Sequence, residues 1–345
     1  MMDLAARTAL AGALVADDAL PIRVTDAFFS RHPEWESRFG AAGRRRCNED
    51  ARFHLSFLAG AIQAGNADIF AEYVVWCAEM LASRNIERAH LLEHLDLVEE
   101  HVPHESAAGD LIARTIAAAR LALSHGADST IAAPDDVTPV RLAYLSAALA
   151  GRRREAWEAT REATRLGVTL PEIYRDIVLW TQRRLGELWA GAKITVAQEH
   201  MASAVTQSIL ARLYAEIPGD RPAGRVLLAG VEGELHVLPA QLASDFLELD
   251  GWDVAFVGTH VPQASVLAAI EAERPDVLGI SMTMAFNLPK TVALVLAVRR
   301  QFSTLPIVIG GRACRGAAAL AKELSVEVDL NGDGGTFRPF ARTPS

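Results

Sequence analysis

The spacing of hydrophobic residues predicts helices over the first two thirds of the 345-residue chain. Apolar residues recur there at three- and four-residue intervals, which is typical of amphipathic helices. In residues 1–130 the pattern is clearest in the segments 51–62, 69–81 and 86–102. It returns after residue 135 in the segments 141–166, 170–188 and 196–217. The second group predicts a small antiparallel bundle, and the small and polar stretch 127–134 predicts a linker before it.

The pattern changes near Pro218-Gly219-Asp220, where a domain boundary is expected. Beyond it, short apolar runs end in Gly or Ser, at 225–230, 253–258, 276–281 and 305–310. Segments with helical spacing separate these runs, at 238–250, 264–273 and 288–301. This alternation predicts a parallel, doubly wound sheet of the flavodoxin-like kind. Such sheets bind ligands beyond the carboxyl ends of their strands.

Composition and motifs narrow the class of protein. The formal net charge is -9 and no long basic block is present, which argues against a general nucleic-acid binder. Cys47, Cys77 and Cys314 lack CxxC spacing, so a reducing cytoplasm is expected. No signal peptide and no run of 18 apolar residues is visible, which disfavours secretion and membrane spanning. Because no hydrolase, kinase or GxGxxG motif appears, we expect a protein that is not an enzyme.

Candidate ligand-binding residues follow each predicted strand. Glu234-Leu235-His236 comes after the first, and a carboxylate two residues before a histidine can hold one ring nitrogen while the other binds a metal. The later strands are followed by Gly258-Thr259, Ser281 and Gly310-Gly311. Glycine lets a ligand approach the backbone, and a serine hydroxyl can bond a buried polar group. Each feature alone is also ordinary turn chemistry, but together they favour one extended ligand.

Residues 224–340 resemble the cobalamin-binding domain shared by methionine synthase, corrinoid proteins and mutases. That family carries Asp-x-His-x-x-Gly, Ser-x-Leu and Gly-Gly after its first, third and fourth strands. His236, Ser281 and Gly310-Gly311 match these positions, whereas Glu234, Pro239 and Met282-Thr283 depart from the pattern. The resemblance implies that His236 binds cobalt from below and that a slot lined by Ser281 and Gly310 holds the dimethylbenzimidazole tail. The other cofactor contacts that it implies are at Val237, Leu238, Gly258, Thr259, Thr283, Gly311, Gly332, Asp333 and Gly334.

A second motif lies in the predicted bundle. Trp189 is followed after nine residues by Glu199-His200, with Gly191 expected to permit a turn between two helices. This spacing resembles the cap of CarH-type photoreceptors, which implies that the three side chains enclose the adenosyl group of adenosylcobalamin. Visible light cleaves the cobalt–carbon bond, so the resemblance implies a light sensor whose bundle moves when the group leaves. The alternative interpretation is a core tryptophan beside a surface Glu-His pair.

The N-terminal zone resembles no winged-helix DNA-binding domain, so we expect no direct nucleic-acid contact. It is rich in aromatic residues and histidines between residues 28 and 102, a diffuse likeness to globins and phycobiliproteins. The whole layout resembles the photocobilins, which pair cobalamin with biliverdin. If a bilin binds, Arg44-Arg45-Arg46 are candidates for its carboxylates and Cys47 and Cys77 for its attachment. A structural dimerisation or docking domain remains the alternative.

These observations predict three domains: an all-α, globin-like domain at 1–130, a four-helix cap bundle at 135–217 and a cobalamin-binding domain at 222–340. The expected function is light sensing through adenosylcobalamin, in a homo-oligomer whose state depends on light and which signals to a partner protein. A corrinoid carrier in methyl transfer is the runner-up, and a haem-type globin sensor is a third possibility.

Overall fold

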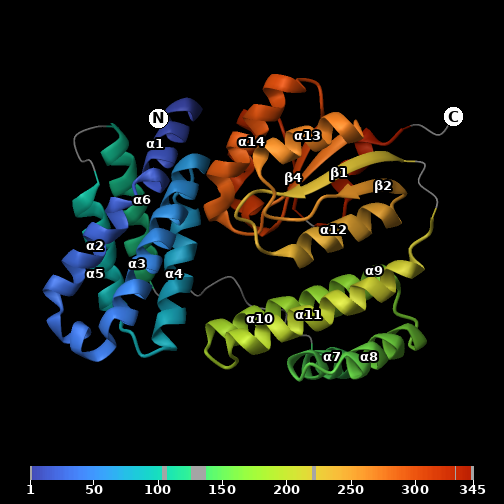
Figure 1. Cartoon of the computed structure of the whole chain (residues 1–345), viewed down its shortest axis with the longest axis horizontal. Coiled ribbons are helices and arrows are strands. Elements are labelled where there is room, and N and C mark those ends of the chain that lie inside the picture. Colours follow the sequence, from blue (N-terminus) through green and yellow to red (C-terminus); the bar gives the residue numbers. More distant parts are fainter. Residues whose placement is uncertain (1, 103–106, 126–136, 220–222, 331, 343–345) are drawn as a thin grey trace.

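The computed structural model describes residues 2–102, 107–125, 137–219, 223–330 and 332–342. Three parts of these residues surround a common centre: an N-terminal helical domain, a helical bundle and a sheet domain (Figure 1). The predicted linker at 127–134 lies outside the described residues. None of the described helices is both long and apolar enough to cross a membrane.

Within the described residues, the N-terminal domain consists of the helices α1 (Leu4–Ala16), α2 (Ala19–Arg31), α3 (Pro33–Ala64), α4 (Asp68–Ala82), α5 (Arg88–His101) and α6 (Ala107–Ser124). The helices predicted at 51–62, 69–81 and 86–102 are confirmed, although the first belongs to the longer α3. Gly40 kinks α3 and Gly65 ends it, both in the positive-φ region that glycine adopts without a steric penalty. Asp3 caps α1 by accepting a hydrogen bond from the amide of Ala6.

The bundle contains α7 (Pro139–Leu149), α8 (Arg153–Arg165), α9 (Leu170–Glu172), the π-helical turn η1 (Ile173–Leu179), α10 (Trp180–Ala190) and α11 (Val196–Leu213). The single helix predicted over 141–166 is wrong: the chain turns at Gly151, whose φ is 70°. The helix predicted over 170–188 forms from α9 to α10, with η1 in its middle. Thr195 and Gln198 form a capping box at the start of α11.

Five parallel strands in the order β2-β1-β3-β4-β5 confirm the doubly wound sheet. The strands are β1 (Gly224–Gly230), β2 (Trp252–Phe256), β3 (Val277–Ser281), β4 (Ile307–Gly310) and β5 (Glu327–Asp329). The described α-helices α12 (Val237–Leu249), α13 (Gln263–Glu273), α14 (Leu288–Gln301) and α15 (Ala318–Leu324) connect consecutive strands. The hydrophobic pattern did not predict β5 and α15, which are only three and seven residues long.

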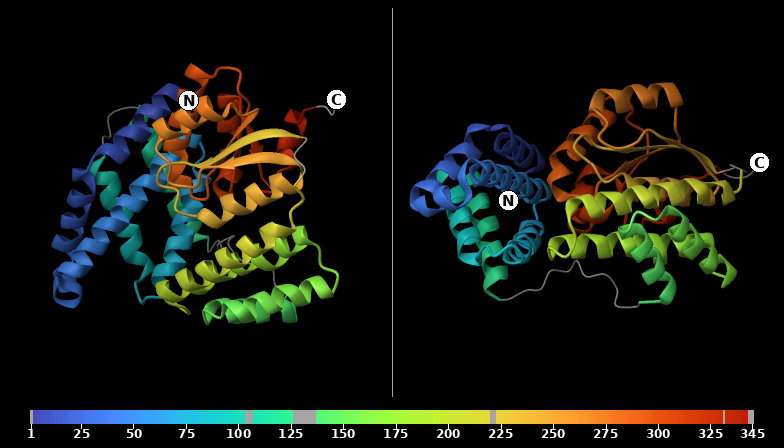
Figure 2. Two further views of the ribbon diagram at one scale, coloured as in Figure 1. Left: turned by 45° about the vertical axis from the view of Figure 1, so that its right-hand side comes forward. Right: turned by 60° about the horizontal axis from the view of Figure 1, so that its bottom comes forward.

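Helix packing holds the three parts together. Helix α12 lies between the sheet and the bundle, and its Leu242 and Phe246 belong to the hydrophobic core of the bundle (Figure 1). The N-terminal domain packs against α14 and α15 on the other side of the sheet domain, and one hydrophobic core runs through both domains. Figure 2 shows these neighbours from two further directions. A Cβ on Gly60 of α3 would lie 2.3 Å from the carbonyl oxygen of Ala285, so this contact requires glycine.

Candidate cofactor site

The residues expected at the strand ends form one row across the carboxyl edge of the sheet. Gly230 of β1 pairs with Ser281 of β3, Ser281 with Gly310 of β4, and Gly310 with Asp329 of β5. Gly258 joins the row from the other side, because its carbonyl accepts a hydrogen bond of 2.9 Å from the amide of Gly230. The order of strands reverses between β1 and β3, which is where doubly wound sheets bind their ligands.

Glu234 and His236 form a tightly held pair in the loop after β1. The Glu234 side chain is fully buried, and its Oε1 lies 2.6 Å from Nδ1 of His236 and accepts the amide N–H of His236 at 2.9 Å. The imidazole itself is 48% exposed, and its Nε2 has no hydrogen-bond partner among the described residues. A ring whose Nδ1 is bonded to a carboxylate presents Nε2 to a metal in a fixed orientation.

The second oxygen of Glu234 connects this loop to the one after β3. Its Oε2 accepts hydrogen bonds from the amide of Thr283 at 2.7 Å and from Nδ2 of Asn287 at 3.2 Å. Burial by itself raises the pKa of the Glu234 carboxyl, but the hydrogen bonds from His236 and Thr283 outweigh it and lower the pKa below the usual value. Glu234 is therefore a carboxylate that ties the two central strand ends together.

Asn287, which the sequence analysis missed, precedes helix α14 and is 1% exposed. Its position before Leu288-Pro289, a signal for the start of a helix, could have drawn attention to it. The hydroxyl of Thr283 is also buried and has no hydrogen-bond partner in the described part of the chain. A buried hydroxyl without a partner is costly, so a ligand that bonds it gains that energy.

Glycines shape the rest of the edge. Gly311 has a φ of 106°, and a Cβ there would lie 2.3 Å from the carbonyl oxygen of Met282, so only glycine fits. At Gly258 and Gly332, by contrast, an added Cβ would meet nothing within 4 Å. These two positions leave open space at the edge of the sheet, as the approach of a ligand to the backbone requires.

The last loop is organised by Asp329, another residue that the sequence analysis missed. Its carboxylate accepts hydrogen bonds from the amides of Gly332 at 3.1 Å and Gly334 at 3.3 Å. Asp333 also lies in this loop, and its Oδ1 accepts a hydrogen bond from the amide of Gly335. An aspartate three residues before Gly332 was the available signal.

The remaining candidates divide between the edge and the core. Thr259 lies against Gly230, and Val237 is the first residue of α12, so both stand at the edge. Leu238 was expected to contact a cofactor, but it is 6% exposed and belongs to the core between α12 and the bundle. Neighbouring side chains of a helix point in different directions, and that of Leu238 points toward the bundle.

The cap residues lie at two neighbouring helix ends. Trp189 stands at the end of α10, and Glu199 and His200 stand in the first turn of α11. His200 is 73% exposed, and its Nδ1 lies 2.5 Å from the Glu199 carboxylate. Gly191 was expected to permit the turn, but Ala192 adopts the left-handed conformation, with a φ of 54°. No hydrogen bond or ring contact joins Trp189 to Glu199 or His200 in the structure as described.

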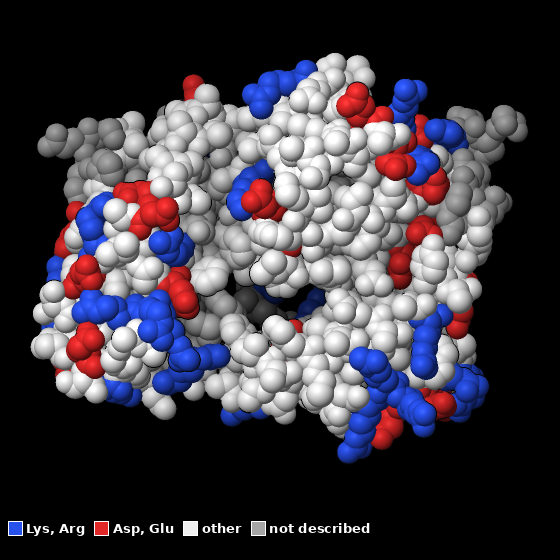
Figure 3. All heavy atoms as spheres, viewed as in Figure 1, with Lys and Arg blue, Asp and Glu red and all other residues white. Residues whose placement is uncertain are grey.

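The three domains meet around an opening that Figure 3 shows in the middle of the molecule. Charged groups from all three parts also act on one another: Glu72 of α4, Arg183 of α10, and Arg312 and Arg315 after β4. Burial, then repulsion by Arg315, lowers the pKa of Arg312; Arg183 adds to this and Glu72 opposes it. The N-terminal domain is thus a third wall of the space beside the sheet edge and the cap.

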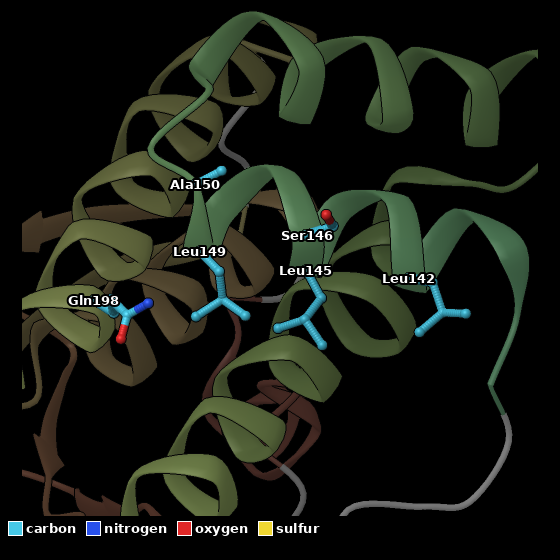
Figure 4. A pocket seen from close by; sticks show the side chains of 6 residues that line it. All are labelled: Leu142, Leu145, Ser146, Leu149, Ala150 and Gln198. Atoms are coloured by element: carbon cyan, nitrogen blue, oxygen red, sulfur yellow. The ribbon is translucent and has the colours of Figure 1, made fainter. Parts of the chain in front are cut away.

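A shallow apolar hollow on the bundle is a separate feature. Leu142, Leu145 and Leu149 of α7 line it together with Gln198 of α11 (Figure 4). Leu142 is about half exposed, so the hollow presents apolar surface to its surroundings. None of its lining residues belongs to the row at the sheet edge.

The N-terminal domain contains buried imidazoles but a poor place for thioether attachment. His54 and His94 are buried, Nδ1 of His54 lies 2.7 Å from the hydroxyl of Tyr73, and the two imidazole rings are 5.1 Å apart. Burial raises the pKa of Cys47 to about 11 and that of Cys77 to about 12, so both thiols stay protonated at neutral pH.

Arg44 is engaged with its own domain. It pairs with Asp26 and Glu36, and its guanidinium lies 4.5 Å from the centre of the Phe29 ring. An arginine held by two carboxylates is less available to the carboxylates of a ligand.

The bundle and the sheet domain both match known families of domains. Residues 224–335 match a B12 binding domain, and residues 140–214 match a second B12 binding domain model. The chain is 34% identical to the HTH-type transcriptional repressor CarA of Myxococcus xanthus over 127 residues, 36% of this chain and 43% of that protein. It is 31% identical to the HTH-type transcriptional repressor CarH of the same organism over 147 residues, 42% of this chain and 48% of that protein.

The matches span less than half the length of these two repressors. Among solved structures, the monomethylamine corrinoid protein of Methanosarcina barkeri is similar at 17% identity and a TM-score of 0.49, over 55% of this chain and 91% of that chain. The bundle and the sheet domain of this chain are therefore a pair of B12-binding domains related to those of the repressors CarA and CarH.

Proposed function

We propose that this protein is a light sensor that holds adenosylcobalamin between its bundle and its sheet domain. The observation that carries the proposal is the Glu234–His236 pair, which presents a free Nε2 at the edge of a B12-binding domain. His236 is the lower ligand of cobalt in this proposal. Bound adenosylcobalamin supplies a cobalt–carbon bond that visible light cleaves.

The residues present fit such a cofactor. The hydroxyl of Thr283 is buried without a partner, and the space beside Gly258 and Gly332 is open. Ser281 and Gly310 are paired neighbours on the central strands, where the dimethylbenzimidazole tail would enter. Glu234 keeps the imidazole oriented and, as a carboxylate, raises the basicity of its free nitrogen.

The upper face of the cofactor is assigned to the cap. Trp189, Glu199 and His200 keep the spacing of the CarH-type cap, and the bundle carries the second B12 match. Trp189 covers the adenosyl group and Glu199 orients His200, which already lies within hydrogen-bonding distance of it. Without an upper group, the space beside Trp189 would lose its packing. The bundle would then shift and would expose or cover surface that a partner protein reads.

A bilin in the N-terminal domain is the second chromophore of this proposal. The motivation is a cluster of buried rings, in which His94 lies 5.1 Å from His54 and 5.7 Å from Phe28. Because Cys47 and Cys77 are buried as thiols, binding would be noncovalent. Biliverdin mixed with the protein should give a red-absorbing complex that His94→Ala weakens and His125→Ala does not.

The lower-ligand assignment is tested by the absorption spectrum of the His236→Ala variant with cobalamin. We expect binding to weaken at least about tenfold, and the spectrum to take the base-off form because cobalt loses its lower nitrogen ligand. His260→Asn is the matched control: this side chain lies at the same edge, where it accepts a hydrogen bond from the amide of Gly233, and asparagine tolerates its positive φ. An unchanged spectrum and affinity in His236→Ala would refute the assignment.

A further inference from the structure

Helix α4 of the N-terminal domain touches both halves of the B12-binding module. At its start, Nδ2 of Asn66 donates a hydrogen bond of 3.0 Å to the carbonyl of Gly316, beyond β4, and a Cβ on Gly316 would lie 2.5 Å from the side chain of Ile69. At its other end, Ser83 and Arg84 reach the end of α10 in the bundle. The helix therefore spans from the sheet edge to the cap.

The contact with α10 is made on its last carbonyl groups. Ser83 Oγ and Arg84 Nη1 donate hydrogen bonds of 2.9 and 3.0 Å to the carbonyl of Ala190, and Arg84 Nη2 donates one of 3.3 Å to that of Trp189. The last carbonyls of a helix lack partners within it and carry partial negative charge. A cationic side chain from another domain thus caps α10 at the residue that carries the cap motif.

Two rings add to this contact. The indole of Trp76 stacks on that of Trp189, with ring centres 6.3 Å apart and an angle of 26° between the planes. The guanidinium of Arg84 lies 5.4 Å from the centre of the Trp189 ring, which is within cation–π distance. Within the described ranges, the three hydrogen bonds to α10 are the only ones that join the N-terminal domain to the bundle.

The side chains that make this contact are also close to groups of their own domain. Arg84 Nη1 lies 2.8 Å from the carbonyl oxygen of Met80, one turn earlier in the chain, and 2.9 Å from Ser83 Oγ, so its two N–H groups are shared among these acceptors and Ala190. The N-terminal domain is meanwhile anchored on the sheet domain, where Phe57 of α3 packs edge to face against Phe286 at 5.4 Å. Trp189 is consequently held at a defined place relative to the sheet edge by a domain that belongs to neither B12-binding half.

We propose that Trp76 and Arg84 are positioning residues for Trp189, and that any displacement of Trp189 at the cofactor is passed through them to the N-terminal domain. The inference deepens the proposed function and rests on it for the second part, because that part places Trp189 beside the upper ligand. The first part, the positioning of Trp189, concerns the cofactor-free protein alone.

The first part is tested by ¹⁹F NMR of the whole protein labelled with 5-fluorotryptophan, without cofactor. The chain has six tryptophans, and the Trp189 resonance is assigned from Trp189→Phe. Trp76→Ala and Arg84→Ala should both move the Trp189 resonance, and Arg84→Lys should restore most of it, because lysine can cap the same carbonyls. The matched control is Arg212→Ala, which removes a guanidinium 5.4 Å from the ring of Trp157 inside the bundle and should leave Trp189 unmoved.

Cobalamin selectivity gives a second readout that a merely structural role would not change. Arg84→Ala should lower the affinity for adenosylcobalamin about tenfold, because its upper group meets Trp189. The affinity for hydroxocobalamin, whose upper ligand is small, should change less than about twofold. A Trp189 resonance that neither variant moves would overturn the positioning role. Equal weakening of both forms would overturn the second part, because Trp189 would then not meet the upper ligand.

The second part is tested on the same labelled protein with adenosylcobalamin, in darkness and after illumination. The resonances of both Trp189 and Trp76 should move on photolysis. If Trp189 moves and Trp76 does not, the proposed relay is wrong although the light sensor stands. If the spectrum of the cofactor shows photolysis but neither resonance moves, the placement of Trp189 over the upper ligand fails, and with it the relay; the positioning of Trp189 is then still decided by the cofactor-free spectra.

Discussion

At the scale of single residues, the site depends on side chains whose orientation is held by hydrogen bonds, above all that of Glu234. Both carboxylate oxygens of Glu234 are occupied, one by His236 and one by Thr283 and Asn287. A shorter aspartate would not reach all three from the same backbone position. The departure of this chain from Asp-x-His thus goes together with a link to the loop after β3.

Gly311 offers a residue-scale prediction. Gly311→Ala should lower the free energy of unfolding by at least about 2 kcal/mol, because the new Cβ meets the Met282 carbonyl and the positive φ adds strain. Gly258→Ala is the control, since its φ of 87° carries strain but an added Cβ there meets nothing within 4 Å; it should cost only about 1 kcal/mol. Urea titration of both variants measures the difference, and equal losses would show that the close contact has little effect.

At the scale of elements, α12 carries buried polar groups between the sheet and the bundle. Asp245 of α12 is 4% exposed, and it lies beside the buried hydroxyl of Tyr174 in the π-helical turn. Burial raises the pKa of Asp245 to about 7; a hydrogen bond with Tyr174 opposes this shift, and the nearby Glu248 carboxylate adds to it. An ionised Asp245 therefore opposes the packing of the bundle on α12.

This element predicts how stability depends on pH. Because the folded protein holds the Asp245 proton up to about pH 7, whereas the unfolded chain releases it near 3.8, the contribution of this group to stability falls as pH rises between these values. Asp245→Asn, which stays neutral, should be more stable than the parent protein at pH 8 by up to about 4 kcal/mol and nearly equal to it at pH 4.

Thermal unfolding at both pH values measures this effect. Asp253→Asn, at an exposed position of β2, serves as the control and should change stability by a few tenths of a kcal/mol at most. A gain from Asp245→Asn that is the same at pH 4 and pH 8 would contradict a buried, protonated aspartic acid.

At the scale of the whole molecule, three domains surround one opening, and a shift of the bundle would change two interfaces at once. One is the contact of α10 with Ser83 and Arg84, and the other is the packing of the bundle on α12. The apolar hollow beside Gln198 lies next to the cap residues Glu199 and His200, so its surface would change with the first turn of α11.

We therefore predict that green light changes the association state of the protein loaded with adenosylcobalamin. Removal of the adenosyl group leaves a space beside Trp189, and the loss of contacts around such a space favours a rearranged bundle. Adenosylcobalamin bound to the Trp189→Ala variant should photolyse normally. The variant should nevertheless keep one association state, because it lacks the side chain whose movement would shift the bundle.

Light scattering coupled to size exclusion, in darkness and after illumination, measures this, and Trp157→Ala is the tryptophan control. Identical masses and elution volumes of the parent protein in both conditions, with photolysis confirmed by the spectrum, would rule out signalling through quaternary structure. That result would favour the alternative of a corrinoid carrier, which has no need for such a response.

Much of the architecture could be predicted because it is encoded locally. Helix α14 has the predicted bounds, and the ends of β1, β3 and β4 bring Gly230, Ser281 and Gly310 into one row, because the carboxyl ends of parallel strands share an edge. The contact between Glu234 and His236 could also be predicted from the sequence, because the two residues are only two positions apart in the chain.

What only the tertiary structure decided involves residues far apart in the chain. Asn287 completes the Glu234 network only because two loops meet at the sheet edge, and Trp76 and Arg84 reach Trp189 only because α4 packs across two domains. Hydrophobic periodicity reports which face of a helix is buried, but it does not report against which partner. The choice of partner follows from the packing of whole domains, and that packing brought the N-terminal domain against both the sheet domain and the end of α10.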